Sequence, residues 1–89
     1  MFKVKLTAKA NKELKQISRR HQLALGQIFE ELKEYPHLGK PLSRGLKGRF
    51  SYRINVYRII YKVNEKDKII YILTAGHRAI AYQKRRKIS

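Results

Sequence analysis

The sequence predicts an α+β domain in which two N-terminal helices pack on one face of a small antiparallel sheet, in the order β-α-α-β-β-β with a short C-terminal helix. Apolar residues recur three and four apart in the first 35 residues, as in amphipathic helices, but alternate with polar residues between positions 50 and 75, as in strands. A segment rich in proline and glycine separates these halves. The 89 residues, 43% of them hydrophobic, suit a single domain spanning 1–89.

The N-terminal part contains a strand and two helices. Apolar residues alternate with lysines over positions 2–6, which indicates a short strand, and Thr7 is suited to cap the helix that follows. Ser18 and the Arg-Arg-His after it interrupt the helical pattern, and a second helix then runs to about Tyr35. The residues expected to face the core are Ala10, Leu14 and Ile17 in the first helix and Leu25, Ile28, Phe29, Leu32 and Tyr35 in the second.

The C-terminal part predicts a three-stranded meander. Two prolines and three glycines mark residues 36–48 as a loop. The following elements are strands at 50–55, 56–63 and 69–75, a tight turn or bulge near Asn55, a polar turn at 64–68, an end of the last strand at Gly76, and a short basic helix at 79–87.

The charge is large and unevenly distributed. The formal net charge is +16; residues 1–35 hold eight Lys/Arg against four Glu, whereas residues 36–89 hold fourteen against two acidic residues. Such a field attracts nucleic acid or an acidic protein. The chain has no cysteine, which excludes disulfides and thiolate chemistry, and no apolar stretch approaches the length of a membrane span. We therefore expect a cytoplasmic protein with a polyanionic partner and no membrane association.

The strands carry cations where neutral polar residues are usual. In the middle strand the odd-numbered positions are the more apolar, so they face the core and Arg58 points to the uncovered side of the sheet. Arg49 and Arg53 share that side, Arg78 follows the last strand, and Tyr82 comes one helical turn later. Arginine binds phosphate through a planar fork, and tyrosine can stack on a base. These residues alone are compatible with a plain binding surface as well as with catalysis.

The sequence contains, in this order, the motifs Leu46-Lys47-Gly48, Tyr52-Arg53-Ile54, Val56-Tyr57-Arg58-Ile59-Ile60-Tyr61, Thr74-Ala75-Gly76-His77-Arg78 and Tyr82. In their order and spacing these motifs resemble the RelE/ParE toxin superfamily, and the match spans nearly the whole chain. The resemblance implies the toxin of a toxin–antitoxin pair, restrained by an acidic antitoxin protein. RelE-like members are ribosome-dependent endoribonucleases that cut messenger RNA without a metal or other cofactor, whereas ParE-like members inhibit DNA gyrase.

The resemblance also implies roles for three residues. Arg58 matches the strand arginine that contacts the scissile phosphate, and Arg78 matches the arginine that stabilises transition-state charge and protonates the leaving group. Tyr82 matches the tyrosine that stacks on or orients the substrate. The implied reaction is attack of a ribose 2′-hydroxyl on the adjacent phosphate, which gives a 2′,3′-cyclic phosphate and a 5′-hydroxyl.

The general base is the open question of this resemblance. Arg53 stands where RelE-type toxins place a lysine, and because arginine keeps its proton it stabilises charge better than it removes a proton. Lys47 and Arg49 match a neighbouring basic, substrate-binding position. His77 titrates in a suitable range, although its alternation with Arg78 is equally compatible with the other face. The two carboxylates of the 64–68 turn are expected far from the site.

Three functions therefore stand in order of preference. The first is a ribosome-dependent mRNA interferase, and the combination of Arg58, Arg78 and Tyr82 favours it. The second is a ParE-like gyrase inhibitor without chemistry of its own. The third is an RNA-binding relative that does not cleave. This reading stays open because Arg53 replaces the strand lysine of RelE-type toxins.

Overall fold

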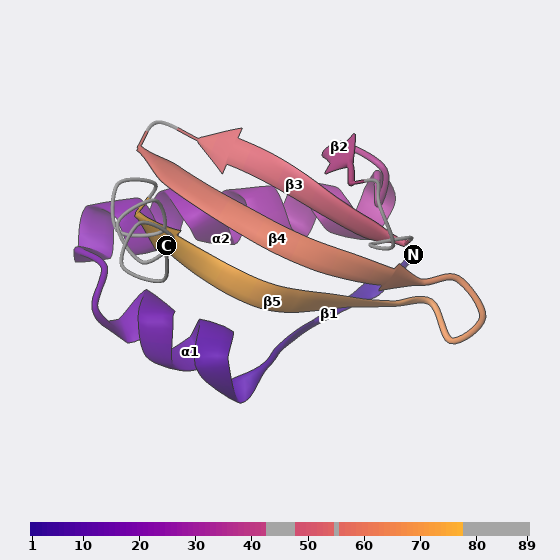
Figure 1. Cartoon of the computed structure of the whole chain (residues 1–89), viewed down its shortest axis with the longest axis horizontal. Coiled ribbons are helices and arrows are strands. Elements are labelled where there is room, and N and C mark those ends of the chain that lie inside the picture. Colours follow the sequence, from indigo (N-terminus) through magenta and orange to yellow (C-terminus); the bar gives the residue numbers. More distant parts are fainter. Residues whose placement is uncertain (43–47, 55, 78–89) are drawn as a thin grey trace, which may run out of the picture.

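The computed structural model describes residues 1–42, 48–54 and 56–77 and has the predicted α+β architecture (Figure 1). The tight turn or bulge predicted near Asn55 and the short helix predicted at 79–87 fall outside the described residues. No helix of the described part is long and apolar enough to cross a lipid bilayer. The elements along this part of the chain are β1 Lys3–Leu6, α1 Ala8–Lys15, α2 Arg19–Glu34, β2 Lys40–Pro41, β3 Arg49–Ile54, β4 Tyr57–Asn64 and β5 Ile69–His77.

These strands form one sheet in the order β1-β5-β4-β3-β2. The meander of β3, β4 and β5 is antiparallel, as the sequence predicts, and Arg58 lies opposite Arg53 on one side and Gly76 on the other. β1 pairs parallel with β5, so the sheet is mixed at this edge. Alternation indicates which face of a strand is buried but not the direction of its neighbour, so the pattern at residues 2–6 could not reveal this pairing.

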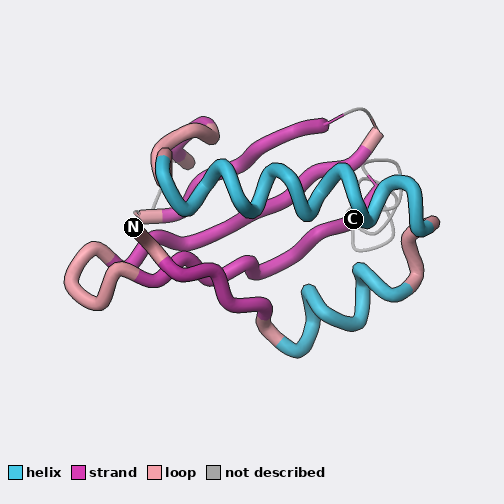
Figure 2. The backbone as a smooth tube through the Cα atoms, turned by 180° about the vertical axis from the view of Figure 1, so that it is seen from behind, coloured by secondary structure: helices cyan, strands magenta, loops and turns pink. Residues whose placement is uncertain are grey.

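The core lies between one face of the sheet and the helices. α2 lies across that face, whereas α1 lies beside β5, beyond the end of β1 (Figure 1 and Figure 2). No helix of the described residues covers the opposite face (Figure 1). The buried hydrophobic residues are Ala10, Ile17, Leu25, Ile28 and Leu32 from the helical half and Ile59, Tyr61, Val63, Ile70, Ile72 and Ala75 from β4 and β5.

Thr7 caps α1 as predicted. Its backbone is extended, and its Oγ1 accepts a hydrogen bond of 3.1 Å from the N–H of Ala10. The same hydroxyl lies 3.0 Å from the carbonyl oxygen of Ile72, to which it donates. The first turn of α1 is therefore fastened to β5.

Four local predictions were wrong. Tyr35, expected to face the core, is exposed, because it follows the last turn of α2 as the C-cap residue. α2 begins at Arg19 with Ser18 as its N-cap, so the basic residues after Ser18 belong to the helix. The proline-rich loop contains a two-residue strand, Lys40–Pro41, because that stretch pairs with β3. Gly76 does not end the last strand, since the ladder with β4 supplies partners as far as His77.

Candidate functional site

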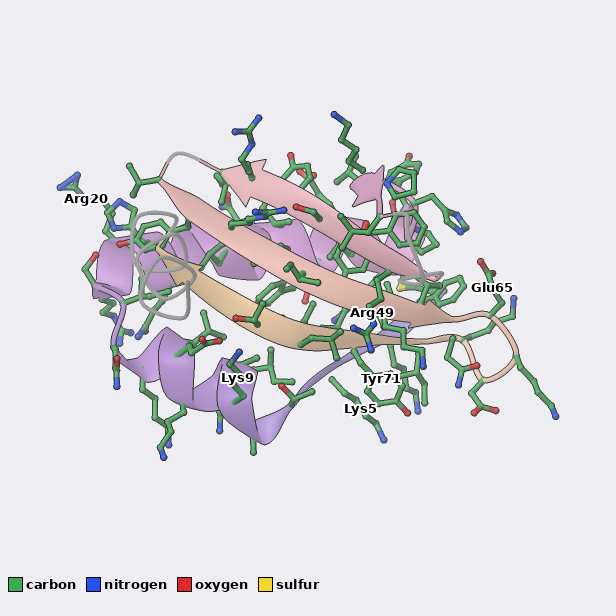
Figure 3. The ribbon with its side chains drawn as sticks, viewed as in Figure 1. Lys5, Lys9, Arg20, Arg49, Glu65 and Tyr71 are labelled. Carbon is green, nitrogen blue, oxygen red and sulfur yellow. The ribbon has the colours of Figure 1, made fainter. Side chains whose placement is uncertain are left out.

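The uncovered face of the sheet carries basic side chains from β3 and β4. Arg53 pairs directly with Arg58, so the two side chains lie side by side on one face. Arg49 has the same parity but lies four residues back along β3, about 13 Å away by strand rise. Figure 3 shows Arg49 in front of the sheet, on the side away from α2. The site is thus a row of cations along two strands, with Arg53 and Arg58 adjacent.

A hydroxyl holds Arg58 in place. The Nε of Arg58 donates a 2.9 Å hydrogen bond to Oγ of Ser51, and both side chains are half-buried. This bond fixes the guanidinium plane while the two terminal nitrogens keep their N–H groups for a ligand. A phosphate accepts a pair of hydrogen bonds from such a fork. Arg58 is therefore preorganised to bind an oxyanion.

The positive charge of this face is not neutralised by the described residues. The two ion pairs in that part of the chain join Lys33 to Glu30 and His37 to Glu65, each at 2.8 Å. Neither involves a cation of β3 or of the start of β4. The open face therefore presents uncompensated positive potential, which favours a polyanion over a neutral ligand.

The remaining sequence-predicted residues are only partly covered by the structure. Lys47, Arg78 and Tyr82 lie outside the described residues. The backbone of His77 forms the last residue of β5 and pairs with Tyr57. The functional roles of all these residues stay predictions.

Sequence reasoning missed two residues whose side chains form hydrogen bonds on the sheet, one beside Arg58 and one at the edge of β5. Ser51 lies between Arg49 and Arg53, and its position in the alternation was a usable signal. Glu13 comes from α1, and its Oε1 accepts hydrogen bonds of 2.7 Å from Oγ1 of Thr74 and 3.1 Å from the N–H of Ala75. A contact across 61 residues leaves no signal in a single sequence.

The loop before β2 supports the backbone at Ser51. The N–H of Gly39 donates a 2.8 Å hydrogen bond to the hydroxyl of Tyr61. Burial raises the pKa of Tyr61, while the bond from Gly39 opposes the shift. A Cβ at Gly39 would stand 2.8 Å from both the carbonyl oxygen of Ser51 and the hydroxyl of Tyr61. Only glycine fits this contact, which fixes the loop against the strand that carries the site.

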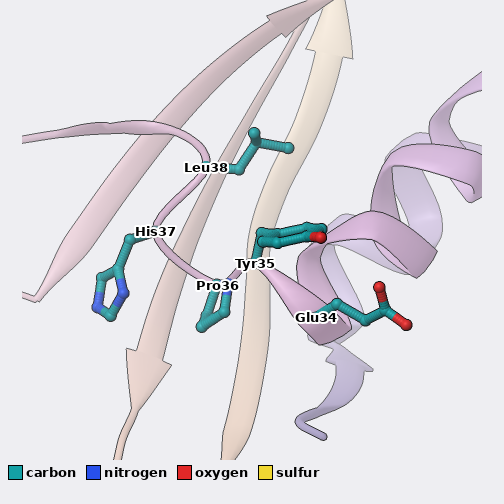
Figure 4. A pocket seen from close by; sticks show the side chains of 5 residues that line it. All are labelled: Glu34, Tyr35, Pro36, His37 and Leu38. Atoms are coloured by element: carbon teal, nitrogen blue, oxygen red, sulfur yellow. The ribbon is translucent and has the colours of Figure 1, made fainter.

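Other places in the described residues offer less chemistry. No three His, Asp or Glu side chains there gather closely enough to hold a metal ion. A shallow pocket lies just after the C-terminal end of α2, which packs beside the start of β1. Arg58 instead pairs with a residue near the end of β5, so this pocket is not part of the site. Its lining residues are Glu34, Tyr35, Pro36, His37 and Leu38 (Figure 4).

Comparisons with known proteins identify this fold as that of small toxin domains. A family model described as ParE toxin of type II toxin-antitoxin system, parDE, matches residues 4–82. The isolated RelE toxin of E. coli has the same fold, with a TM-score of 0.78 at 16% identity over the whole of both chains.

More similar sequences narrow the class to a family. Toxin RelG of Mycobacterium tuberculosis is 33% identical over 85 residues, which cover 93% of this chain and 98% of RelG. A toxin–antitoxin complex, RelBE2 of the same organism, contains a chain that superposes with a TM-score of 0.80 at 32% identity, covering 86% of this chain and 98% of that one. The chain belongs to the RelE/ParE superfamily, and it is a toxin of the type II toxin–antitoxin class.

Proposed function

We propose that this toxin is a ribosome-dependent endoribonuclease that cleaves messenger RNA and thereby inhibits translation. The observation that carries the proposal is Arg58, held by Ser51 on an open face where the described residues provide no carboxylate partner. The similarity to toxins named RelG and RelE supports the same choice.

The proposed reaction is attack of a ribose 2′-hydroxyl on the neighbouring phosphorus, with departure of the 5′-oxygen. Negative charge grows on the phosphoryl oxygens in the transition state, and fixed cations stabilise that charge more than they stabilise the substrate. Arg58 is placed to bind these oxygens through its two terminal nitrogens. Arg53, its cross-strand neighbour, adds charge at the same point.

Other residues enter the proposal through the resemblance alone. We assign Arg78 to the leaving oxygen and Tyr82 to stacking on the substrate. Lys47 and Arg49 are assigned to binding of the RNA substrate. His77 is kept as a substrate-binding residue next to Arg78.

The proposed partners are an acidic antitoxin, the ribosome and messenger RNA. Solved structures with this fold include the toxin–antitoxin complexes RelBE2 of Mycobacterium tuberculosis and RelBE of E. coli. A protein that covers the open face here must neutralise the cations of β3 and β4, so we expect an acidic segment to lie across them.

Induction of the toxin with mapping of transcript 5′ ends tests this function. Wild type should arrest growth and create new 5′ ends within translated messages, whereas Arg58→Ala should do neither while still binding its antitoxin. Lys66→Ala is the matched control, because Lys66 is exposed in the turn at the far end of β4 from Arg58. Full toxicity of Arg58→Ala would reject the site.

A ParE-like gyrase inhibitor is the second candidate, favoured by the description of the matching family model. That function predicts DNA damage signalling on induction, intact messages, and toxicity that survives Arg58→Ala. A non-cleaving RNA-binding relative predicts salt-sensitive binding to RNA with no new 5′ ends. The same induction experiment separates all three.

A further inference from the structure

Four neighbouring strands carry one line of side chains across the sheet, toward the turn that joins β4 to β5. Lys5 of β1 pairs with Tyr71 of β5, and Tyr71 pairs with Lys62 of β4. Lys62 in turn pairs with Arg49 of β3. Residues directly opposite each other in neighbouring strands share a face, so these four side chains form a single row, which we call the basic row. Figure 3 shows Lys5, Tyr71 and Arg49 over the same part of the sheet.

The basic row lies on the uncovered face of the sheet. The residues on either side of Lys62 and of Tyr71 in their strands are buried in the core: Tyr61, Val63, Ile70 and Ile72. Because side chains alternate along a strand, Lys62 and Tyr71 point away from that core. The three cations of the row are exposed, and Tyr71 is half-buried. The row is therefore open to a ligand on the same face as Arg58.

Tyr71 differs from the tyrosines that serve the core. In the part of the chain that the structure describes, the hydroxyls of Tyr57 and Tyr61 contact His21 and the N–H of Gly39, whereas Tyr71 makes no hydrogen bond and no contact with another ring. A tyrosine on an open sheet face can stack on a nucleobase, and cations beside it can bind the phosphates of the same strand. Tyr71 stands between two lysines, as such a platform requires.

The charges of the basic row repel one another in the unbound protein. Arg49 and Lys62 are directly opposite each other, and like charges in such a pair destabilise a sheet. Among the described residues, no carboxylate forms an ion pair with a cation of the row. The two acidic side chains of the turn after β4 have other partners, His37 for Glu65 and Asn64 for Asp67. A polyanion lying across the row relieves this repulsion.

We propose that the basic row is a second RNA-binding site, which holds the message beyond the scissile linkage; this proposal rests on the proposed nuclease function. Lys62 follows Arg58 by four residues along β4, about 13 Å by strand rise, and both side chains are on the same face. A single strand bound at Arg58 therefore reaches the row by following β4. Tyr71 stacks on a base of that strand, and the three cations bind its phosphates. An acidic protein segment would use the cations but has no base to place on Tyr71.

Tyr71→Ile tests the stacking, because isoleucine keeps an apolar side chain suited to a strand but has no aromatic ring. Its affinity for a fluorescent single-stranded RNA, 2′-O-methylated to prevent cleavage, should be about 5- to 100-fold lower than that of wild type in anisotropy titrations. Tyr71→Phe keeps the ring and should retain most of the affinity. Tyr35→Ile is the matched control, since Tyr35 is 63% exposed at the end of α2, and it should bind like wild type. Wild-type affinity of Tyr71→Ile would overturn the proposal.

Lys5→Ala and Lys62→Ala test the charges, and they decide the matter if Tyr71→Ile does not fold. Each should lower the slope of log affinity against log salt for the same RNA by about 1, whereas Arg20→Ala, an exposed site on α2, should leave the slope unchanged. Poly-glutamate is the probe for an acidic protein segment. If the two lysine variants lose affinity for poly-glutamate and keep their affinity for RNA, the row binds acidic protein and the proposal is overturned.

Programmed ribosomes distinguish the message from ribosomal RNA. The upstream part of a bound message is paired with transfer RNA, so the strand available to the row is the part beyond the cleavage site. Ending the message a few nucleotides past that site should raise the wild-type concentration needed for half-maximal cleavage to the value for Tyr71→Ile. A difference between the two proteins that persists on the shortened message would assign the row to ribosomal RNA and overturn the message as its ligand.

The binding titrations also separate this proposal from the nuclease function, because they need neither a ribosome nor cleavage. If wild type cleaves and Tyr71→Ile binds RNA like wild type, the nuclease function stands and the second site is overturned. If wild type fails to cleave while Tyr71→Ile loses affinity for the free RNA, the nuclease function falls and the row is supported as an RNA-binding site alone.

Discussion

Replacing Ser51 with alanine separates the orientation of Arg58 from its charge. The variant removes the acceptor of the 2.9 Å bond from Nε and leaves the guanidinium present but free to rotate. Because Ser51 is only half-buried on the uncovered face of the sheet, loss of its hydroxyl should leave the fold intact. The effect should appear in the cleavage rate rather than in the stability.

The size of the effect follows from the bond. A hydrogen bond to a charged group contributes about 1.5–3 kcal/mol when well buried. The half-buried position of both side chains lowers this to about 1–2 kcal/mol. Since about 1.4 kcal/mol corresponds to tenfold in rate, Ser51→Ala should cleave about 5–30 times more slowly than wild type.

The assay is single-turnover cleavage of messenger RNA on programmed ribosomes, combined with a double-mutant cycle. Arg58→Lys has no Nε, so adding Ser51→Ala to it should change the rate by no more than about twofold. A wild-type rate for Ser51→Ala would refute the view that Ser51 orients Arg58. An equal loss in the Arg58→Lys background would refute it as well.

Three further predictions concern stability and binding. Gly39→Ala should lower the free energy of unfolding by about 1–3 kcal/mol in urea titrations, because its Cβ would stand 2.8 Å from the carbonyl oxygen of Ser51; wild-type stability would show that the loop moves freely. Tyr61→Phe should remove a loss of stability that occurs at alkaline pH. Burial raises the pKa of Tyr61 from 10.0 in the folded state, so the tyrosine ionises first in the unfolded state. The folded state therefore loses stability as the pH rises above that value. A wild-type pH dependence in Tyr61→Phe would contradict this. Arg49→Ala and Arg53→Ala should each lower the slope of log affinity against log salt for single-stranded RNA by about 1, and unchanged slopes would place the RNA elsewhere.

The sequence predicts the parts of this structure that depend on local periodicity. Thr7 is a cap because its side chain is short and polar and a helical stripe follows, and the structure has that cap. The alternation around Arg58 places it on the face away from Tyr61, and the ladder register agrees. Such features are set by residues close together in the chain.

Features that depend on tertiary contacts could not be predicted from the sequence. The parallel pairing of β1 with β5 is decided by where the meander ends, which alternation does not encode. The position of Glu13 depends on the end of β1, after which the N–H of Ala75 at the edge of β5 needs a partner from another element. The pattern of α1 shows Glu13 only as a polar residue on a short helix.

Both outer strands of the sheet are short and basic. At one border β2 is two residues long, Lys40–Pro41, and its proline has no N–H to offer a neighbour. At the other border β1 is four residues long and exposes Lys3 and Lys5. We therefore expect like charges to oppose the joining of two copies of this protein through their sheet edges. A foreign strand that extends the sheet at either border must bring acidic side chains of its own.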